Sequence, residues 1–163
     1  MTKNTDIKTA TRDWMLGYRS WMTHAVTLTM KQYRIVGTDK GQTVQTLTAE
    51  EARKNFRHFM SRLNRSMYGN GPKCHYVIPV LEGVATGKNL HYHCVMGNFR
   101  EEKSHEEIVE AIRNAWRKTS FGNEQIDVQI MYGDDWLNYI TKEVGMGNAD
   151  SVDYGNVYVP DSR

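Results

Sequence analysis

The amino-acid sequence predicts one α+β domain, in which an antiparallel sheet carries two helices on one face and a further helix follows the last strand. The length of 163 residues is that of a single domain of ordinary size. Four segments alternate apolar and polar residues, which is typical of half-buried strands. Two other segments open with a capping box and continue with apolar residues three and four positions apart, which is typical of helices packed on a sheet.

The composition favours a folded protein without a membrane-spanning or secreted segment. Apolar residues make up 39% of the chain and aromatic residues 10%, within the range of folded domains. The N-terminus is polar and the apolar runs are short, so we expect neither a membrane span nor a signal peptide. Cys74 and Cys94 form no Cys-x-x-Cys pair, so we expect reduced strand residues rather than a disulfide or a zinc knuckle.

The first strand follows a segment without a clear period. Residues 1–23 contain several aromatic side chains, and we expect them to form an irregular or partly helical arm packed on the domain. In residues 24–30 apolar side chains alternate with Thr27 and Thr29, which predicts the first strand. A polar loop with two glycines is expected next.

Two capping boxes predict the two helices that cover the sheet. Thr48 and Glu51 open the first helix, which runs to about Tyr68 before a Gly-Asn-Gly-Pro breaker. Ser104 and Glu107 open the second helix, which is expected to end before a glycine. The apolar stripes consist of Ala52, Phe56, Phe59, Leu63 and Met67 in the first helix and Ile108, Ile112, Ala115 and Trp116 in the second.

A hairpin and one more strand complete the predicted sheet. Residues 74–82 are expected at the edge of the sheet, because Pro79 cannot donate a backbone hydrogen bond. A turn over 83–89 connects this strand to the next, over 90–96. The fourth strand is expected over 126–132, where the alternation returns.

The order of the predicted elements, β-α-β-β-α-β-α, is that of the split βαβ, ferredoxin-like fold with an added C-terminal helix, here over 135–144. In this fold two helices cover one face of the sheet, so we expect the other face to be free for a site. The expected organisation is an N-terminal arm over 1–23, a domain over 24–144, and a Gly/Asn/Asp-rich tail or linker over 145–163.

Two histidines and a carboxylate predict a metal site. The apolar residues of strand 90–96 point into the core, so His91 and His93 stand together on the opposite face, close enough to bind one divalent cation. Glu82 lies across the hairpin turn and supplies a third ligand, which leaves open positions for water or a phosphate oxygen. The alternatives are a chance histidine pair beside a solvated acid, or His75 as a substitute ligand.

A tyrosine and a lysine on the last predicted helix form a candidate nucleophile. Tyr139 and Lys142 are three residues apart and therefore share a helix face. A free tyrosine has a pKa of about 10, so its phenolate costs about 4 kcal/mol at pH 7, and a nearby ammonium and divalent cation reduce that cost. An exposed tyrosine and lysine are also common on short helices without any catalytic role.

Positive charge is concentrated in the first part of the chain. Residues 1–70 contain 12 Lys and Arg against 5 Asp and Glu, whereas residues 71–163 contain 9 against 14. Such an asymmetry is typical of a nucleic-acid footprint, although a solvated helix face has the same appearance. Thr27 and Thr29 are further candidates for DNA contact, with core packing or edge pairing as the alternative. The basic residues of the first predicted helix are Arg53, Lys54, Arg57, Arg62 and Arg65.

The order of these motifs resembles that of HUH endonucleases of the single-tyrosine rolling-circle replication initiator type. The resemblance spans residues 24–144. Residues 91–93 (HYH) match the His-hydrophobic-His motif, and residues 139–143 (YITKE) match Tyr-x-x-Lys followed by an acid. Glu82 matches the acidic metal ligand of this family, and residues 27–29 (TLT) match its first motif loosely.

The resemblance implies sequence-specific nicking and rejoining of single-stranded DNA at the replication origin of a plasmid, phage or virus. Tyr139 would attack a phosphate, form a 5′-phosphotyrosyl link and free a 3′-hydroxyl, with Lys142 in support. The implied cofactor is Mn²⁺ or Mg²⁺, held by Glu82, His91 and His93, and no membrane is involved. Because the chain has no GxxxxGK[ST] motif, unwinding would require a helicase domain or a host helicase. The expected location is the cytoplasm, or the nucleus for a eukaryotic virus.

Two other functions remain open at the level of the sequence. A single-tyrosine HUH transposase has a similar length, although Lys142 and Glu82 favour the initiator pattern. The non-enzymatic alternative is a ferredoxin-like module that binds single-stranded nucleic acid through the basic helix.

Overall fold

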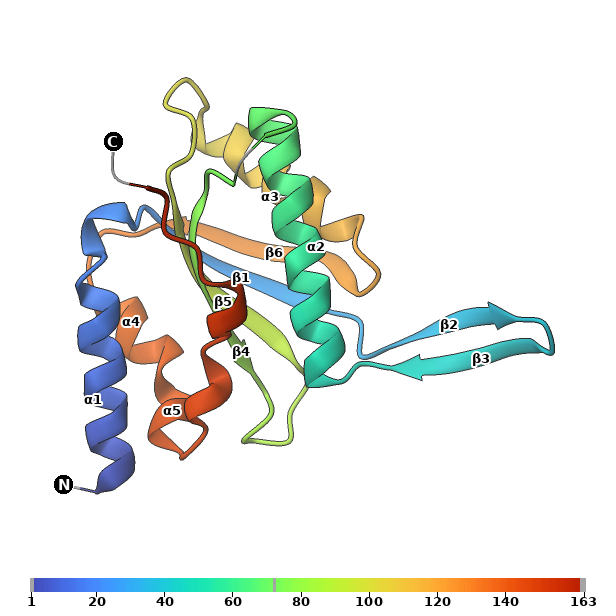
Figure 1. Ribbon diagram of the computed structural model, residues 1–163, viewed down its shortest axis with the longest axis horizontal. Coiled ribbons are helices and arrows are strands. Elements are labelled where there is room, and N and C mark those ends of the chain that lie inside the picture. The colour runs from blue at the N-terminus through green and yellow to red at the C-terminus, as the bar shows by residue number, and fades with distance from the viewer. Residues whose placement is uncertain (1, 72, 162–163) are drawn as a thin grey trace.

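A four-stranded antiparallel sheet lies at the centre of the computed structural model, which describes residues 2–71 and 73–161 (Figure 1). The two hairpin strands are neighbours at one side, and the first and last strands complete the other side. This architecture confirms the predicted α+β, ferredoxin-like class. Among the described helices, none combines the length and the apolar character needed to cross a membrane. The strands, in sheet order, are β4 (Tyr76–Glu82), β5 (His91–Gly97), β1 (His24–Met30) and β6 (Gly122–Ile130).

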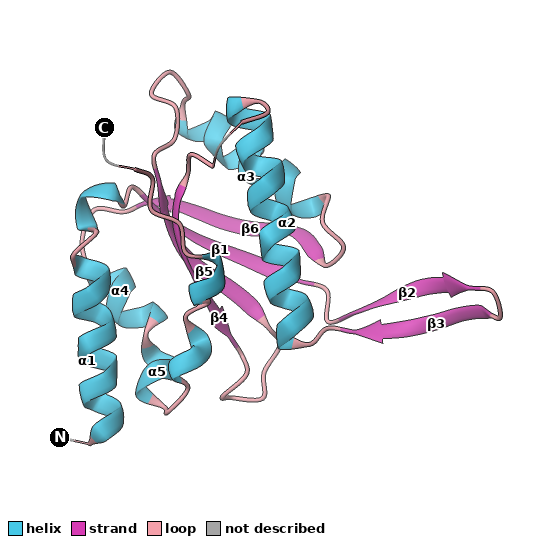
Figure 2. Ribbon diagram, viewed as in Figure 1, coloured by secondary structure: helices cyan, strands magenta, loops and turns pink. Residues whose placement is uncertain are grey.

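Two helices cover one face of the sheet, α2 (Ala49–Tyr68) and α3 (His105–Arg117), as Figure 2 shows. Thr48 caps α2 by accepting a hydrogen bond from the N–H of Glu51, and Ser104 forms a complete capping box at α3, as predicted. The core on this face joins apolar side chains of both helices to those of β1 and β5. Its largest members are Phe56, Phe59, Leu63, Tyr92, Met96 and Trp116.

The other face of the sheet is not free, and that expectation is wrong. The helix α1 (Lys3–Leu16) and two short helices, α4 (Asp135–Ile140) and α5 (Lys142–Gly145), lie against the β4–β5 half of this face. Their apolar side chains need a partner surface, and β4 and β5 supply it. This second core contains Met15, Tyr76, Ile78, Val80, Val95, Leu137, Ile140 and Val144.

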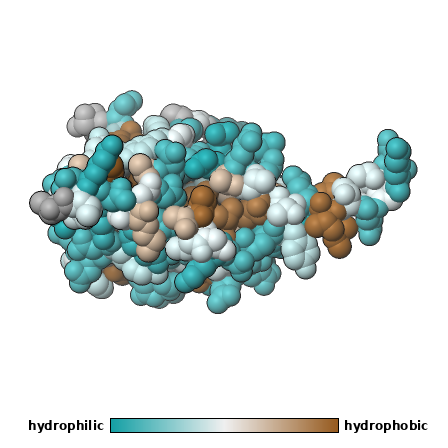
Figure 3. All heavy atoms as spheres, turned by 90° about the horizontal axis from the view of Figure 1, so that it is seen from below, coloured by the Kyte–Doolittle hydropathy of each residue, from teal (hydrophilic) through white to brown (hydrophobic). Residues whose placement is uncertain are grey.

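A two-stranded ribbon projects from the body where the sequence predicted a polar loop (Figure 1). It consists of β2 (Tyr33–Thr38) and β3 (Gly41–Thr46). Both of its faces are largely exposed, so its sequence lacks the apolar–polar alternation by which half-buried strands are detected. Figure 3 shows apolar surface on this ribbon, where Ile35 and Val44 are cross-strand partners.

The strand β4 lies at an edge of the sheet, as Pro79 predicted. The segment after α5 runs along this edge, where Val152 forms a bridge with Val80 and Tyr158 forms one with Val77. The carbonyl of Pro79 accepts a 2.9 Å hydrogen bond from the N–H of Asp153. The segment expected as a polar tail therefore packs on the sheet, while the proposed domain boundaries remain predictions.

Candidate active site

The pairing of β4 with β5 brings one carboxylate and two imidazoles together. Glu82 is opposite His91 and Val80 is opposite His93, so alternation places Glu82, His91 and His93 on the same face. The Nε2 atom of His93 lies 2.9 Å from Oε2 of Glu82, and the two Nε2 atoms lie 3.1 Å apart. The ligand atoms of all three residues lie within 4.8 Å of one another, so they converge on a volume that one ion can fill.

The second nitrogen of each imidazole has its own partner. The Nδ1 of His91 lies 3.0 Å from the carbonyl of Asn89, and the Nδ1 of His93 lies 2.9 Å from the hydroxyl of Thr27. Such contacts fix the ring orientation and leave both Nε2 atoms directed at the common centre. Burial lowers the pKa of His93 to about 3, and the neighbouring His91 and Lys142 contribute to this shift. A neutral imidazole is the form that binds a metal, so this donor set fits a divalent cation.

The last predicted helix is broken between the two residues expected to share its face. Its first part, α4, ends at Ile140, and α5 begins at Lys142 after Thr141, whose hydroxyl donates back to the carbonyl of Leu137. The break does not separate the functional pair. The Nζ of Lys142 lies 4.2 Å from the ring centre of Tyr139.

Tyr139 and Lys142 both border the cluster formed by Glu82, His91 and His93. The ring of Tyr139 packs edge-on against that of His93, with centroids 5.2 Å apart, and 46% of this tyrosine is exposed. The ammonium of Lys142 lies 2.5 Å from Oε1 of Glu82. Although partial burial lowers the pKa of Lys142, its hydrogen bonds to Glu82 and Tyr139 raise it above the ordinary value. Trp136 stacks on the other side of Tyr139 at 5.4 Å, which holds the ring in place.

Glu143 has a role in the site that its position in the motif did not reveal. It is buried, and its carboxylate accepts hydrogen bonds from the N–H of Gly83 at 2.6 Å and of Ala85 at 2.8 Å. Gly83 directly follows Glu82 and has a φ of 115°, and a Cβ there would collide with the carbonyl of Asn89. Glu143 thus ties the helix of Lys142 to the turn that follows the carboxylate ligand. The sequence signal was an acid directly after the motif lysine.

Thr27 and Thr29, expected to contact DNA, both use their hydroxyls within the fold. The hydroxyl of Thr27 pairs with His93, and that of Thr29 donates to the carbonyl of Gln125 at 2.6 Å. Both side chains remain partly exposed on the face that carries the cluster. Their role in DNA binding remains a prediction.

The basic residues of α2 are not brought to the cluster. This helix packs on the face of the sheet opposite to that of His91 and His93. The same face receives His75, whose ring lies against Asn64 and Met67, so the alternative of His75 as a metal ligand is wrong. Burial lowers the pKa of His75 to about 4. The α2 residues concerned are Arg53, Lys54, Arg57, Arg62 and Arg65.

Comparison with known proteins gives one match. The model of a family described as replication-associated protein of the ORF2 type matches residues 23–144. These residues contain the cluster of Glu82, His91 and His93 as well as Tyr139 and Lys142. No curated protein and no solved structure matches the chain.

Proposed function

The chain belongs to the ORF2-type family of replication-associated proteins, and we propose that it initiates rolling-circle replication by nicking and rejoining single-stranded DNA at an origin. The observation that carries this proposal is the position of Tyr139. Its ring contacts the metal-ligand candidate His93 and lies beside the ammonium of Lys142. A nucleophile, a cation and a donor set for a divalent metal thus occupy one surface.

In this proposal Glu82, His91 and His93 hold Mn²⁺ or Mg²⁺. When bound, such an ion polarises the scissile phosphate and offsets the charge that develops on it. The hydrogen bonds from His91 to Asn89 and between His93 and Thr27 keep the imidazoles aligned. The three side chains leave the remaining positions of the ion for the substrate.

The proposed covalent step uses the hydroxyl oxygen of Tyr139. This oxygen forms a bond to phosphorus, and the bond from phosphorus to the 3′ oxygen of the preceding nucleotide breaks. The 5′ part of the downstream strand remains on the tyrosine as a phosphodiester, and the upstream strand keeps a 3′-hydroxyl. The ammonium of Lys142 stabilises the phenolate and the charged phosphate. Attack of the 3′-hydroxyl on the same phosphorus reverses the step and rejoins the strand.

The half of the sheet formed by β1 and β6 supplies a path for the single strand. Among the described residues, the apolar cluster under α1, α4 and α5 includes side chains of β4 and β5 but none of β1 or β6. Thr27 and Thr29 of β1 are therefore placed to contact sugar or bases, and Gln125 and Gln129 of β6 are exposed beside them. Phosphate contacts by the basic residues of α2 remain part of the proposal, as contacts outside the cleavage site.

Two expectations about the wider system belong to this proposal. Unwinding would come from a helicase domain or a host helicase, because no nucleotide-binding motif occurs in the chain. The protein would act in the cytoplasm, or in the nucleus of a eukaryotic host. The family match favours an initiator over a transposase, and the convergence of Tyr139 and Lys142 on the cluster favours an enzyme over a binding module.

The proposal is tested by looking for a covalent product. Circular single-stranded DNA carrying the cognate origin is incubated with Mn²⁺, and the protein is separated under denaturing conditions. The wild type should form a protein–DNA adduct, and Tyr139→Phe should form none while it still binds DNA. Tyr132→Phe is the matched control, because Tyr132 is 88% exposed and should be dispensable.

A second variant tests the metal in the same assay. Replacement of both His91 and His93 with alanine should abolish cleavage and leave the fold and weak DNA binding intact. Hydrolysed DNA without an adduct in the wild type would contradict the tyrosine mechanism. Full cleavage by the double variant would contradict the metal site.

A further inference from the structure

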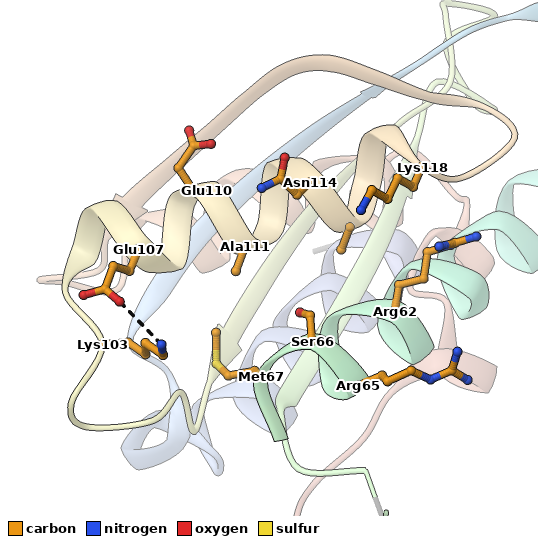
Figure 4. A pocket seen from close by; sticks show the side chains of 11 residues that line it. Arg62, Arg65, Ser66, Met67, Lys103, Glu107, Glu110, Ala111, Asn114 and Lys118 are labelled. Carbon is orange, nitrogen blue, oxygen red and sulfur yellow. Dashed lines mark ion pairs between the residues drawn. The ribbon is translucent and has the colours of Figure 1, made fainter. Parts of the chain in front are cut away.

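A groove between the outer surfaces of α2 and α3 carries a concentration of positive charge far from the cluster. It encloses a volume of about 550 Å³, and a second hollow of about 320 Å³ shares three of its lining residues. These shared residues are Arg62 and Arg65 of α2 and Lys118 at the end of α3, called the groove cations below. Figure 4 shows them toward one end of the groove, away from Glu107 and Lys103.

The groove cations have no acidic partner in the part of the chain that the structure describes. None of the ion pairs recorded for these residues involves them. The two acids of the groove, in contrast, have cationic partners of their own. Glu107 pairs with Lys103 at 3.5 Å, and Glu110 pairs with Arg113. The groove therefore presents uncompensated positive charge to an external anion.

The chemistry of the groove favours phosphate over bases. Among the described residues, no phenylalanine, tyrosine or tryptophan lines either hollow, so unpaired bases would find no platform on which to stack. The apolar lining consists of Met67, Ala111 and Ala115, and Asn114 and Ser120 offer polar contacts beside the cations. We propose that this groove binds the phosphate backbone of duplex DNA at a site separate from the one that cleaves a single strand. The choice of DNA as ligand rests on the proposed function.

The separation of the two sites follows from the layers of the fold. The groove lies on the outer side of α2 and α3, whereas Glu82, His91 and His93 lie on the opposite face of the sheet. The helix layer alone is about 10 Å thick, so DNA in the groove is not within contact distance of Tyr139. The groove would hold duplex next to the exposed strand and thereby raise the local concentration of the nick site.

The experiment compares duplex binding with cleavage in one variant. Arg62→Ala, Arg65→Ala and Lys118→Ala are combined; all three side chains are exposed, so the fold is expected to persist. Binding of a short blunt duplex is measured by fluorescence anisotropy at several salt concentrations. The slope of log affinity against log salt should fall by about 0.9 per lost cation, or about 2.7 in total. Adduct formation with a short single-stranded oligonucleotide should be unchanged.

A second triple variant separates a local site from general charge. Lys3→Ala, Lys31→Ala and Lys40→Ala remove the same charge from exposed positions outside the groove and should leave the duplex slope near that of the wild type. An equal loss in both triple variants, or no loss in either, would overturn the proposal. Loss of cleavage with the groove variant would also overturn it, by making the groove part of the cleavage site. If the wild type forms no adduct, the proposed function fails, and the duplex measurement still decides on the groove.

Discussion

The buried carboxylate of Glu143 accepts a 2.6 Å hydrogen bond from the backbone N–H of Gly83. This contact joins two segments sixty residues apart in the chain, the helix of Lys142 and the turn that follows Glu82. Because Lys142 also contacts Glu82, the position of the cation relative to the metal ligands depends on this carboxylate. We therefore regard Glu143 as a positioning residue.

Glu143→Gln should weaken both the fold and the reaction. The amide keeps the shape of the side chain, but its NH₂ group would face a backbone N–H that then has no acceptor, at a cost of about 1–3 kcal/mol. Urea denaturation should show this loss in the free energy of unfolding. Adduct formation should slow further than DNA binding weakens. Glu106→Gln, at an exposed position of α3, is the control, and equal stability of the two variants would contradict the role of Glu143.

Thr27→Val should weaken metal binding without loss of fold. Valine has the shape of threonine but cannot hold the Nδ1 of His93, and loss of such a contact typically lowers metal affinity by about 10- to 100-fold. Isothermal titration with Mn²⁺ measures this directly, without DNA. Thr29→Val is a matched control on the same strand, because its hydroxyl bonds Gln125 instead. Equal metal affinity of the two variants would show that Thr27 does not position His93.

Lys142→Ala should change metal affinity and rate in opposite directions. Removal of the ammonium frees the oxygen of Glu82 that it contacts and removes a repelling charge, so the affinity for Mn²⁺ should rise. Adduct formation should slow by roughly a hundredfold, because the phenolate of Tyr139 loses its cation. Titration with Mn²⁺ and single-turnover kinetics measure the two effects. Lys88→Ala, in the exposed turn after β4, should alter neither, and a faster reaction in Lys142→Ala would refute its supporting role.

Acid should destabilise the fold through two buried histidines. Burial lowers the pKa of His24 and of His75 to about 4 in the folded protein, from an ordinary value of 6.5. Below pH 6.5 the unfolded chain therefore binds protons that the folded chain does not, and stability falls until the pH reaches about 4. The slope should approach about 1.4 kcal/mol per pH unit for each histidine.

Urea denaturation across this pH range measures the slope. His75→Gln should reduce it, whereas His58→Gln, at an exposed position of α2, serves as the control. A free energy of unfolding that stays constant from neutral pH to pH 4 would rule out this account. So would an equal slope in wild type and His75→Gln.

Several features of the site follow from local pattern alone. The alternation in residues 90–96 sends Tyr92, Cys94 and Met96 into one core and His91 and His93 to the other face, because the two-residue period of a strand is a property of the backbone. Capping residues predicted where α2 and α3 begin, since they satisfy backbone N–H groups within one turn. Proline predicted the edge position of β4 for an equally local reason.

The remaining features depend on contacts between distant segments. No local pattern could specify that Glu143 reaches Gly83, or that the hydroxyl of Thr27 turns to His93, because these contacts form only when separate elements pack. The same holds for the face of the sheet on which the arginines of α2 lie, and for the covering of the other face by α1, α4 and α5. Residue type and period follow from backbone geometry, whereas the distances between residues that act together are set by the packing of whole helices on the sheet.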